Sequence, residues 1–287
     1  MSGDILTLIQ ENMTTFSKGQ KRIAAFILAS YDKAAFMTAS KLGQTTSVSE
    51  STVVRFAAEL GFDGYPDMQK ALQKMVRNRL TSVQRIEMAN DQIGQDGVVA
   101  SVLRADIARI RTTLEELDSA SFDRAVDAIL NAKNIYILGV RSSSAISRFL
   151  AFYFNLIFDN VREIDANTIS EVFEQVLRVG KGDVLIGVSF PRYSSRTVKA
   201  MQYAQDRGAT VVAITDSENS PVADHADIIL TAKSDMASFV DSLVAPLSLV
   251  NALIVAVSQK RSQEVANTFR QLEQIWEEYD VYEKNED

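Results

Sequence analysis

The chain of 287 residues contains no cysteine and only one histidine. Without cysteine it can form neither a disulfide framework nor a thiolate metal site, and this composition fits the cytoplasm. No apolar run approaches the roughly 20 residues of a transmembrane helix, and the first residues lack the basic-then-apolar pattern of a signal peptide. We therefore expect a cytoplasmic protein with no membrane segment, no metal and no cofactor.

The length and the charge distribution indicate two domains. A chain of 287 residues can form two cores of ordinary size, and 46% hydrophobic with 23% charged residues is typical of a globular protein. Residues 1–90 hold 11 Lys/Arg and 8 Asp/Glu, a net charge of +3, whereas residues 91–287 hold 19 and 29, a net charge of −10. A basic segment on an acidic body favours a polyanion-binding module, although +3 over ninety residues can arise by chance.

Residues 42–61, LGQTTSVSESTVVRFAAELG, have the pattern of two short helices joined by a turn. Apolar residues share one face of the second helix at helical spacing, at Val53, Phe56, Ala57 and Leu60. Four residues occupy the buried positions of a helix-turn-helix, namely Leu42, Val48, Val53 and Phe56. Gly43 lies at the expected tight contact between the helices, and Ser47 lies in the turn.

The outward face of the second helix suits DNA recognition. A recognition helix presents small polar groups and an arginine near its N-terminus to base edges in the major groove. Base contacts are expected from Glu50, Ser51, Thr52 and Arg55. Ser49 is the expected N-cap, where its hydroxyl would accept a backbone N–H and meet a phosphate. The alternative is a helical hairpin inside an ordinary bundle.

Three lysines are candidates for contacts to the DNA backbone: Lys18, Lys21 and Lys41. Lys18 and Lys21 lie in the first half of a helix that Ser17 is expected to cap, where cations oppose the helix dipole. A DNA phosphate bound by these two lysines would compensate for their unfavourable position. The alternative is that both are only solvated. Arg22, in the same half of the helix, is expected to be solvated.

The segments around this motif complete a predicted five-helix domain over residues 1–80. Residues 61–66, GFDGYP, predict a helix stop and a turn, and a last helix is expected from Asp67 to Leu80. A polar interdomain linker is predicted at residues 81–96.

Residues 97–287 alternate short apolar runs with amphipathic stretches. Helices are expected at residues 98–117, 122–130, 145–158, 170–178 and 195–207. Strands are expected at residues 135–140, 161–164, 183–189, 210–215 and 227–230. Strands separated by helices of about 10–15 residues predict a parallel sheet with helices on both faces. Two closing helices are expected at residues 242–260 and 264–282. The predicted fold class is an all-α helix-turn-helix domain followed by an α/β domain with a five-stranded parallel sheet.

Hydroxyl-rich loops follow two of the predicted strands. In an open parallel sheet, ligands bind beyond the carboxyl ends of the strands. Candidate ligand-binding residues after the first strand are Arg141, Ser142, Ser143 and Ser144, and those after the third strand are Ser189, Arg192, Ser194, Ser195 and Thr197. Helix N-termini and hydroxyls hold a phosphate or carboxylate without metal, and the arginines would help if they point inward. The alternative is that these serines only cap helices.

These motifs resemble a known family. In the N-terminal part, residues 48–56 (VSESTVVRF) and 60–66 (LGFDGYP) follow the family's characteristic run. In the C-terminal part, the similar residues are 139–144 (GVRSSS), Ser189 with residues 194–197, and 227–230 (DIIL). The chain resembles bacterial transcriptional regulators of the RpiR/MurR type, in which a helix-turn-helix domain is joined to a sugar-isomerase-like (SIS) domain.

The resemblance implies a regulator of carbohydrate metabolism. Its SIS domain would bind a phosphosugar, form a homodimer or homotetramer, and change the affinity for a palindromic operator in double-stranded DNA. By match, the family's ligand-binding places fall on Ser143, Ser189, Ser194 and Thr197.

The chain departs from the family at five points, one of which is Gly43 in place of a usual alanine in the helix-turn-helix. Arg141 stands at a usual glycine, Ser195 stands at another, and Pro191-Arg192-Tyr193 lengthens the third-strand loop. Because glycines let a phosphate approach the backbone, these changes favour a phosphosugar of another shape or a sugar acid. Ser47 replaces the usual glycine of the helix-turn-helix turn, where a positive φ would cost on the order of 1 kcal/mol.

The rival hypothesis is a sugar-phosphate isomerase, which uses the same α/β domain. Isomerisation needs a general base near the sugar carbons. His225 lies in ADHAD before a strand, where a structural role is expected, and Glu171 and Glu174 lie on an amphipathic helix. We therefore expect no catalytic residue and no enzyme. A third possibility is an oligomeric scaffold that senses no ligand.

Overall fold

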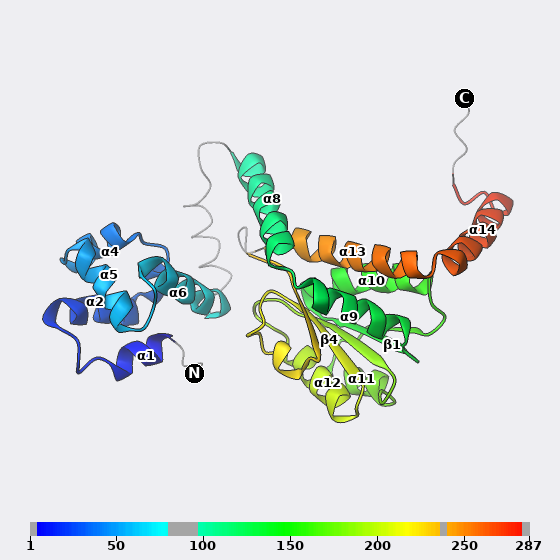
Figure 1. The fold of residues 1–287 in the computed structure, drawn as a ribbon, viewed down its shortest axis with the longest axis horizontal. Coiled ribbons are helices and arrows are strands. Elements are labelled where there is room, and N and C mark those ends of the chain that lie inside the picture. The colour runs from blue at the N-terminus through cyan, green and yellow to red at the C-terminus, as the bar shows by residue number, and fades with distance from the viewer. Residues whose placement is uncertain (1–4, 80–96, 236–239, 283–287) are drawn as a thin grey trace. The chain divides into compact units, whose positions relative to one another are not determined.

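The computed structural model describes residues 5–79, 97–235 and 240–282 (Figure 1). The chain divides into two compact units, Met1–Glu87 and Met88–Asp287. The linker predicted at residues 81–96 lies wholly outside the described residues. Within the described part of the chain, no helix combines the length and apolar content that a bilayer crossing requires.

The described part of the first unit is helical. Its elements are α1 (Ile5–Glu11), α2 (Lys18–Ala29), α3 (Tyr31–Ala34), α4 (Ala39–Thr46), α5 (Glu50–Glu59) and α6 (Tyr65–Arg79). The sequence predicts five of these helices. It misses α3, because a single turn of four residues has no recognisable periodicity. The last helix begins at Tyr65, two residues before the expected start, with Pro66 in its first turn, where proline is well tolerated.

The first unit is held together by the apolar face predicted for α5. Val53, Phe56 and Ala57 are fully buried, and the Phe56 ring lies 5.0 Å from that of Phe16, just before α2. Ser17 forms a capping box with Gln20 at the start of α2, as expected for an N-cap. These contacts fix α2 against α5.

The second unit contains one five-stranded parallel sheet with the strand order β2-β1-β3-β4-β5. The strands are β1 (Ile135–Gly139), β2 (Val161–Ile164), β3 (Val184–Val188), β4 (Thr210–Thr215) and β5 (Ile228–Thr231). The helices are α8 (Val98–Glu116), α9 (Ser119–Leu130), α10 (Ser144–Asn155), α11 (Ile169–Val176), α12 (Ser195–Asp206), α13 (Val244–Lys260) and α14 (Ser262–Glu278). All five strands and these helices correspond to predicted elements, with ends shifted by a few residues.

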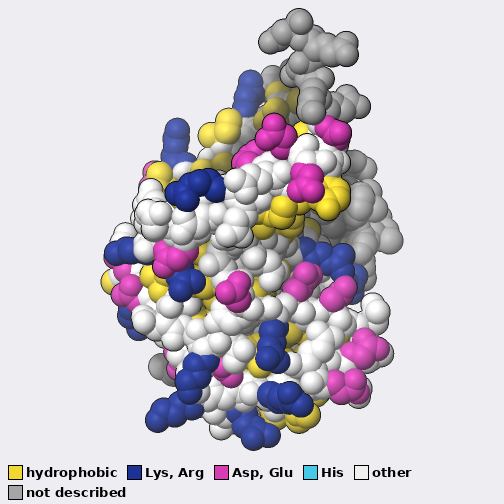
Figure 2. Space-filling view, turned by 90° about the vertical axis from the view of Figure 1, so that its right-hand side faces the viewer, with side chains coloured by type: hydrophobic (Ala, Val, Ile, Leu, Met, Phe, Trp, Pro, Cys, Tyr) yellow, Lys and Arg dark blue, Asp and Glu magenta, His cyan; other side chains and the backbone are white. Residues whose placement is uncertain are grey.

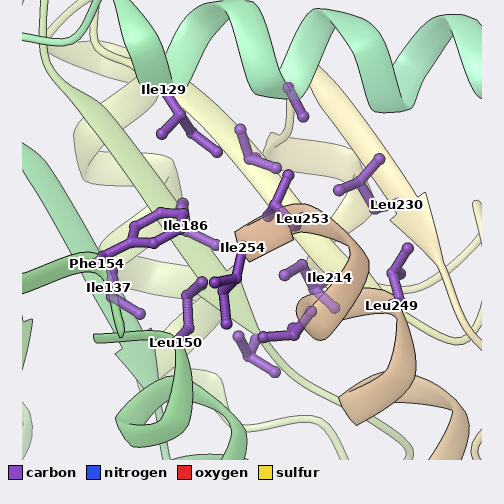
Figure 3. Packing of buried hydrophobic residues seen from close by; sticks show 14 of the residues in the cluster. Ile129, Ile137, Leu150, Phe154, Ile186, Ile214, Leu230, Leu249, Leu253 and Ile254 are labelled. Atoms are coloured by element: carbon purple, nitrogen blue, oxygen red, sulfur yellow. The ribbon is translucent and has the colours of Figure 1, made fainter. Parts of the chain in front are cut away.

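Helices cover both faces of the sheet. Side chains alternate along each strand, so Ile135 and Ile137 of β1 face one core while Tyr136 and Leu138 face the other. The first core is filled by α9, α10 and α13, and Figure 3 shows Leu150, Phe154 and Leu253 converging there with the strand residues. The second core is filled by α11 and α12. Burial on both faces explains why the central strands β1, β3 and β4 are apolar runs, whereas the edge strand β2 exposes Arg162 and Glu163.

Candidate functional site

The turn between α4 and α5 has the tight geometry of a helix-turn-helix. A Cβ atom on Gly43 would lie 2.9 Å from the Val48 carbonyl oxygen, so the two helices approach too closely for a side chain. Ser47 has φ 55° and ψ 47°, the left-handed conformation expected for this position. Its carbonyl accepts a hydrogen bond from the Arg22 guanidinium, with Nη1 at 3.1 Å. Arg22 is exposed, as expected, and its guanidinium also anchors the turn through this bond.

Ser49 is the N-cap residue of α5 by position but makes no side-chain cap among the described residues. Its Oγ lies 2.9 Å from both Ser51 Oγ and Thr52 Oγ1. The expected capping bond is thus wrong, because neighbouring hydroxyls compete for the Ser49 side chain. The result is a cluster of three hydroxyls at the start of α5.

The outward face of α5 has the composition expected of a DNA-reading surface. Ser49, Glu50, Ser51 and Arg55 are exposed, and Thr52 is half-buried. Arg55 Nε donates to the Ser51 carbonyl at 3.3 Å, so the guanidinium lies along its own helix. Of the four predicted buried positions, Leu42, Val53 and Phe56 are buried, whereas Val48 is only half-buried.

The three predicted phosphate-contacting lysines, Lys18, Lys21 and Lys41, are all exposed. Lys18 precedes Gly19, whose Cβ position lies 3.4 Å from Thr52 Cγ2 and 3.5 Å from Val48 Cγ1. The start of α2 therefore lies beside the start of α5. Lys41 lies in the first turn of α4, where its backbone N–H donates to the Thr38 cap at 3.2 Å.

The second candidate site lies at the carboxyl edge of the sheet. Gly139 pairs with Val188, so β1 and β3 end side by side, and Ser189 N donates to the Ile214 carbonyl of β4 at 3.1 Å. The loops that follow β1, β3 and β4 therefore meet. Gly139 is required at the first of these ends, because a Cβ atom there would lie 2.5 Å from the Ser143 carbonyl oxygen.

Three predicted ligand residues, Ser143, Ser189 and Thr197, are buried at this edge. Ser189 Oγ accepts the Ser194 N–H at 3.2 Å, and Ser194 Oγ accepts the Arg196 N–H at 3.3 Å as the N-cap of α12. A hydroxyl that accepts in this way keeps its own proton for donation. Ser189 and Ser194 therefore cap the loop and can also donate hydrogen bonds to an anion.

Two buried hydroxyls here lack hydrogen-bond partners among the described residues. Thr197 Oγ1, on a fully buried residue, is one, and Ser220 Oγ, in the segment after β4, is the other. A buried hydroxyl without a partner destabilises a fold by about 1–3 kcal/mol. Such groups are rare in native proteins, and each calls for an explanation. A bound ligand that accepts these hydrogen bonds would supply one.

The remaining predicted ligand residues are not brought together with the buried hydroxyls. Arg141, Ser142, Arg192 and Ser195 are exposed, and Ser144 Oγ donates to the Arg141 carbonyl at 2.6 Å. Arg141 and Arg192 have φ of 60° and 63°, a conformation that favours glycine. Ser195 is the first residue of α12, with φ outside the left-handed region, so no glycine is needed there.

Tyr193 and Asp216 also lie at the candidate site, and the sequence did not indicate either as a site residue. Tyr193 lies in the lengthened β3 loop, and its Oη donates to Asp216 Oδ1, after β4, at 2.7 Å. Burial and the neighbouring Asp216 carboxylate raise the pKa of the Tyr193 phenol, which keeps it protonated as the donor. Asp216 and Ser220 could have been found by treating the end of β4 like the ends of β1 and β3.

The candidate catalytic bases have structural roles. Glu171 accepts the N–H groups of Asn167 and Thr168 at 2.7 and 3.3 Å, and these bonds lower the pKa of its carboxyl. Glu174 accepts a hydrogen bond from Ser170 Oγ at 3.2 Å. His225 Nδ1 lies 3.4 Å from Gln205 Oε1, where α12 meets the segment before β5.

Comparison with known proteins assigns both units. Residues 3–79 match the helix-turn-helix domain of the rpiR family, and residues 128–256 match the SIS domain. The chain belongs to the RpiR family of transcriptional regulators. It is a DNA-binding regulator rather than an enzyme, and its relatives carry the same role in their names.

Two relatives align over most of their length. The transcriptional regulator HexR of Escherichia coli is 24% identical over 284 residues, covering 96% of this chain and 95% of HexR. An HTH-type transcriptional regulator of Haemophilus influenzae is 28% identical over 232 residues, covering 80% of each chain.

Two solved structures share the fold. The Vibrio vulnificus NanR protein complexed with ManNAc-6P is 23% identical with a TM-score of 0.59, over 95% of this chain and 97% of NanR. The sugar isomerase domain of an RpiR transcription factor from Sphaerobacter thermophilus is 27% identical with a TM-score of 0.59, over 61% of this chain and 97% of that domain.

Replacing Ser47 with glycine should stabilise the RpiR-family helix-turn-helix unit. Glycine removes the left-handed strain of about 1–2 kcal/mol, and part of this gain is offset by the greater entropy of the unfolded chain. We expect a net gain of up to about 1 kcal/mol in the free energy of unfolding of this unit, measured by calorimetry. The matched control is Ser51→Gly, in the helical part of α5, which should destabilise by about 0.5–1 kcal/mol. Equal effects of the two substitutions would contradict the assigned turn.

Proposed function

We propose that the SIS unit senses an anionic sugar, either a phosphosugar or a sugar acid, and that binding changes the affinity of the helix-turn-helix unit for its operator. The observation that carries this proposal is Thr197 Oγ1, a buried hydroxyl without a partner at the carboxyl edge of a parallel sheet. Ligands bind at that edge in open α/β sheets. The NanR complex with ManNAc-6P supports a phosphosugar, because its fold is shared.

The ligand anion would be held by hydroxyls and backbone N–H groups. Ser143, Ser189 and Ser194 would donate their protons together with Thr197, and the α12 N-terminus would add N–H groups and the positive end of its dipole. No metal is needed for such a site. Arg141 and Arg192 would contribute from the exposed rim, with Ser142, Ser144 and Ser195 beside them.

At the other unit, α5 would enter the major groove of double-stranded DNA. Arg55, Ser51, Thr52 and Glu50 would read base edges, while Ser49, Lys18, Lys21 and Lys41 would contact phosphates. A homodimer or homotetramer would present two such helices to a palindromic operator. The domains would comprise residues 1–80 and 97–287, and the regulator would act in the cytoplasm on genes of carbohydrate metabolism.

Arg55→Ala should weaken specific DNA binding by about 1–3 kcal/mol, because it removes a base contact. The operator is first selected from random duplexes with the wild-type protein, and affinities are then measured by fluorescence anisotropy. Lys33→Ala is the control, since Lys33 is an exposed cation on α3 outside the proposed interface, and it should keep wild-type affinity. Wild-type affinity for Arg55→Ala would remove Arg55 from the proposed contacts.

Thr197→Val should lower the affinity for the sugar without lowering the stability of the free protein. Valine keeps the shape and removes the unpartnered hydroxyl, so the free protein should be as stable as wild type or up to about 1 kcal/mol more stable. The affinity for the anionic sugar should fall about tenfold or more, because a hydrogen bond to a charged group is worth about 1.5–3 kcal/mol. Both quantities are measured by calorimetry, using the phosphosugar or sugar acid that stabilises the wild type most.

The matched control is Thr113→Val in the same unit. Thr113 Oγ1 accepts the Lys233 N–H at 2.9 Å and is buried, so this change should destabilise the unit by about 1–3 kcal/mol without changing sugar affinity. A Thr197→Val variant that loses stability like the control, or that keeps full sugar affinity, would refute the assigned role.

A further inference from the structure

Helix α8 turns its apolar face outward and its polar face inward. Five apolar residues at helical spacing are exposed, with exposed fractions between 40% and 76%: Val99, Leu103, Ile107, Ile110 and Leu114. Arg109 and Thr113, on the opposite face, are buried. A surface helix normally has the reverse arrangement. The exposed apolar row of α8 is therefore typical of an interaction surface.

Polar contacts fix α8 in this orientation. Arg109 Nη1 donates to Asp106 Oδ1 at 2.9 Å, and the same oxygen accepts the Ser242 hydroxyl proton at 2.6 Å. Thr113 accepts the Lys233 N–H, and the Lys233 ammonium is paired with Glu116. Rotating α8 to bury its apolar row would break its contacts with Ser242 and Lys233. The outward apolar row is thus a property of the folded unit.

The adjoining helix α13 continues the apolar surface. It contains no charged residue from Val244 to Gln259, and Val244, Leu247 and Val255 are exposed on it. Helix α8 packs beside α13. We call the outward faces of these two helices the α8–α13 surface. A helix face without charge can pair with its own copy, because no like charges are brought together.

Helix α14 has an apolar face with little to pack against. None of its 17 residues is buried against the described residues, and Val265, Phe269, Leu272 and Trp276 are half-buried along one side. Figure 1 shows α14 extending from the end of α13, and in Figure 2 hydrophobic side chains reach the surface beside carboxylates below the grey atoms at the top. Among the described residues, this helix packs on little besides the end of α13.

The charges of α8 and α14 are complementary. Helix α14 carries four glutamates and one arginine, a net charge of −3: Glu264, Glu273, Glu277, Glu278 and Arg270. Helix α8 is neutral overall, but Asp106 is paired with Arg109 and Glu116 with Lys233. The charges left exposed beside its apolar row are those of Arg104, Arg111 and Glu115, a net charge of +1. Opposite charges around two apolar faces favour their association and set the register.

The arrangement of the three helices suggests how two copies meet. The Asp106–Ser242 contact ties α8 to the start of α13, whereas α14 follows the end of α13 (Figure 1). A two-fold axis through the middle of the outward face of α13 would pair α13 with its copy in antiparallel fashion. The same axis would bring α14 of each copy to the apolar row of α8 on the other.

We propose that a second copy of this chain covers the α8–α13 surface, with α14 of each copy packed on α8 of the other. This inference rests on the proposed homo-oligomer and names its interface. The isologous contact buries both apolar faces that the unit leaves open. It also joins the two sensor units through α8, the first described helix after the helix-turn-helix unit.

The oligomeric state of the full chain tests this proposal. Light scattering during gel filtration should give at least twice the chain mass of 31.7 kDa for the wild type. The double variant Leu103→Glu/Ile107→Glu should run at half the wild-type mass or less, with an unchanged circular dichroism spectrum. Leu177→Glu, a matched change at an exposed leucine after α11, should keep the wild-type mass.

A single cysteine gives a second readout, because the chain has none of its own. Asn251→Cys, at an exposed position midway along α13, should form a covalent dimer with a short bifunctional thiol reagent. Leu177→Cys should not. A monomeric wild type would overturn both the homo-oligomer and this interface. An oligomeric wild type whose double variant keeps its mass, or whose Asn251→Cys variant is not linked, would overturn the interface alone.

Discussion

The parallel pairing of β1, β3 and β4 is the constraint on which the sensor unit depends. Because Gly139 pairs with Val188, and Val188 with Ile214, the loops that leave these strands meet at one edge of the sheet. Both faces of the strands are covered by helices, so the edge is where a small molecule can reach the backbone N–H groups of α12 and the buried hydroxyls. The candidate ligand site follows from the topology.

That edge holds features that do not favour the stability of the free protein. Thr197 and Ser220 bury hydroxyls without partners among the described residues, and Arg141 and Arg192 adopt left-handed backbone conformations. Strain and unsatisfied polar groups persist where binding needs them. The hydrogen bond from Tyr193 to Asp216 has the opposite effect and stabilises the free protein, because it fixes the lengthened β3 loop to the segment after β4.

Most of the architecture could be predicted from the sequence, because it depends on periodicity. Continuous apolar runs identified the central strands β1, β3 and β4, and the spacing of Val53, Phe56 and Ala57 identified the buried face of α5. Ser47 was expected to adopt a positive φ, and it does. The features that the sequence did not predict depend on contacts between distant residues or are too short to show a periodicity. The one-turn α3, the Arg22 bond to the Ser47 carbonyl and the Tyr193–Asp216 bond depend on contacts that no local pattern encodes.

The central claim is that the hydroxyl-lined edge of the SIS unit binds an anionic sugar. The most direct measurement is the melting temperature of the full chain against a panel of phosphosugars and sugar acids, each beside its neutral sugar. A ligand that binds only the folded state stabilises it by about 2.7 kcal/mol at one hundred times its Kd. The account predicts that at least one anionic sugar raises the melting temperature while its neutral counterpart does not. Equal responses to charged and neutral sugars, or none to any anionic sugar at millimolar concentration, would contradict it.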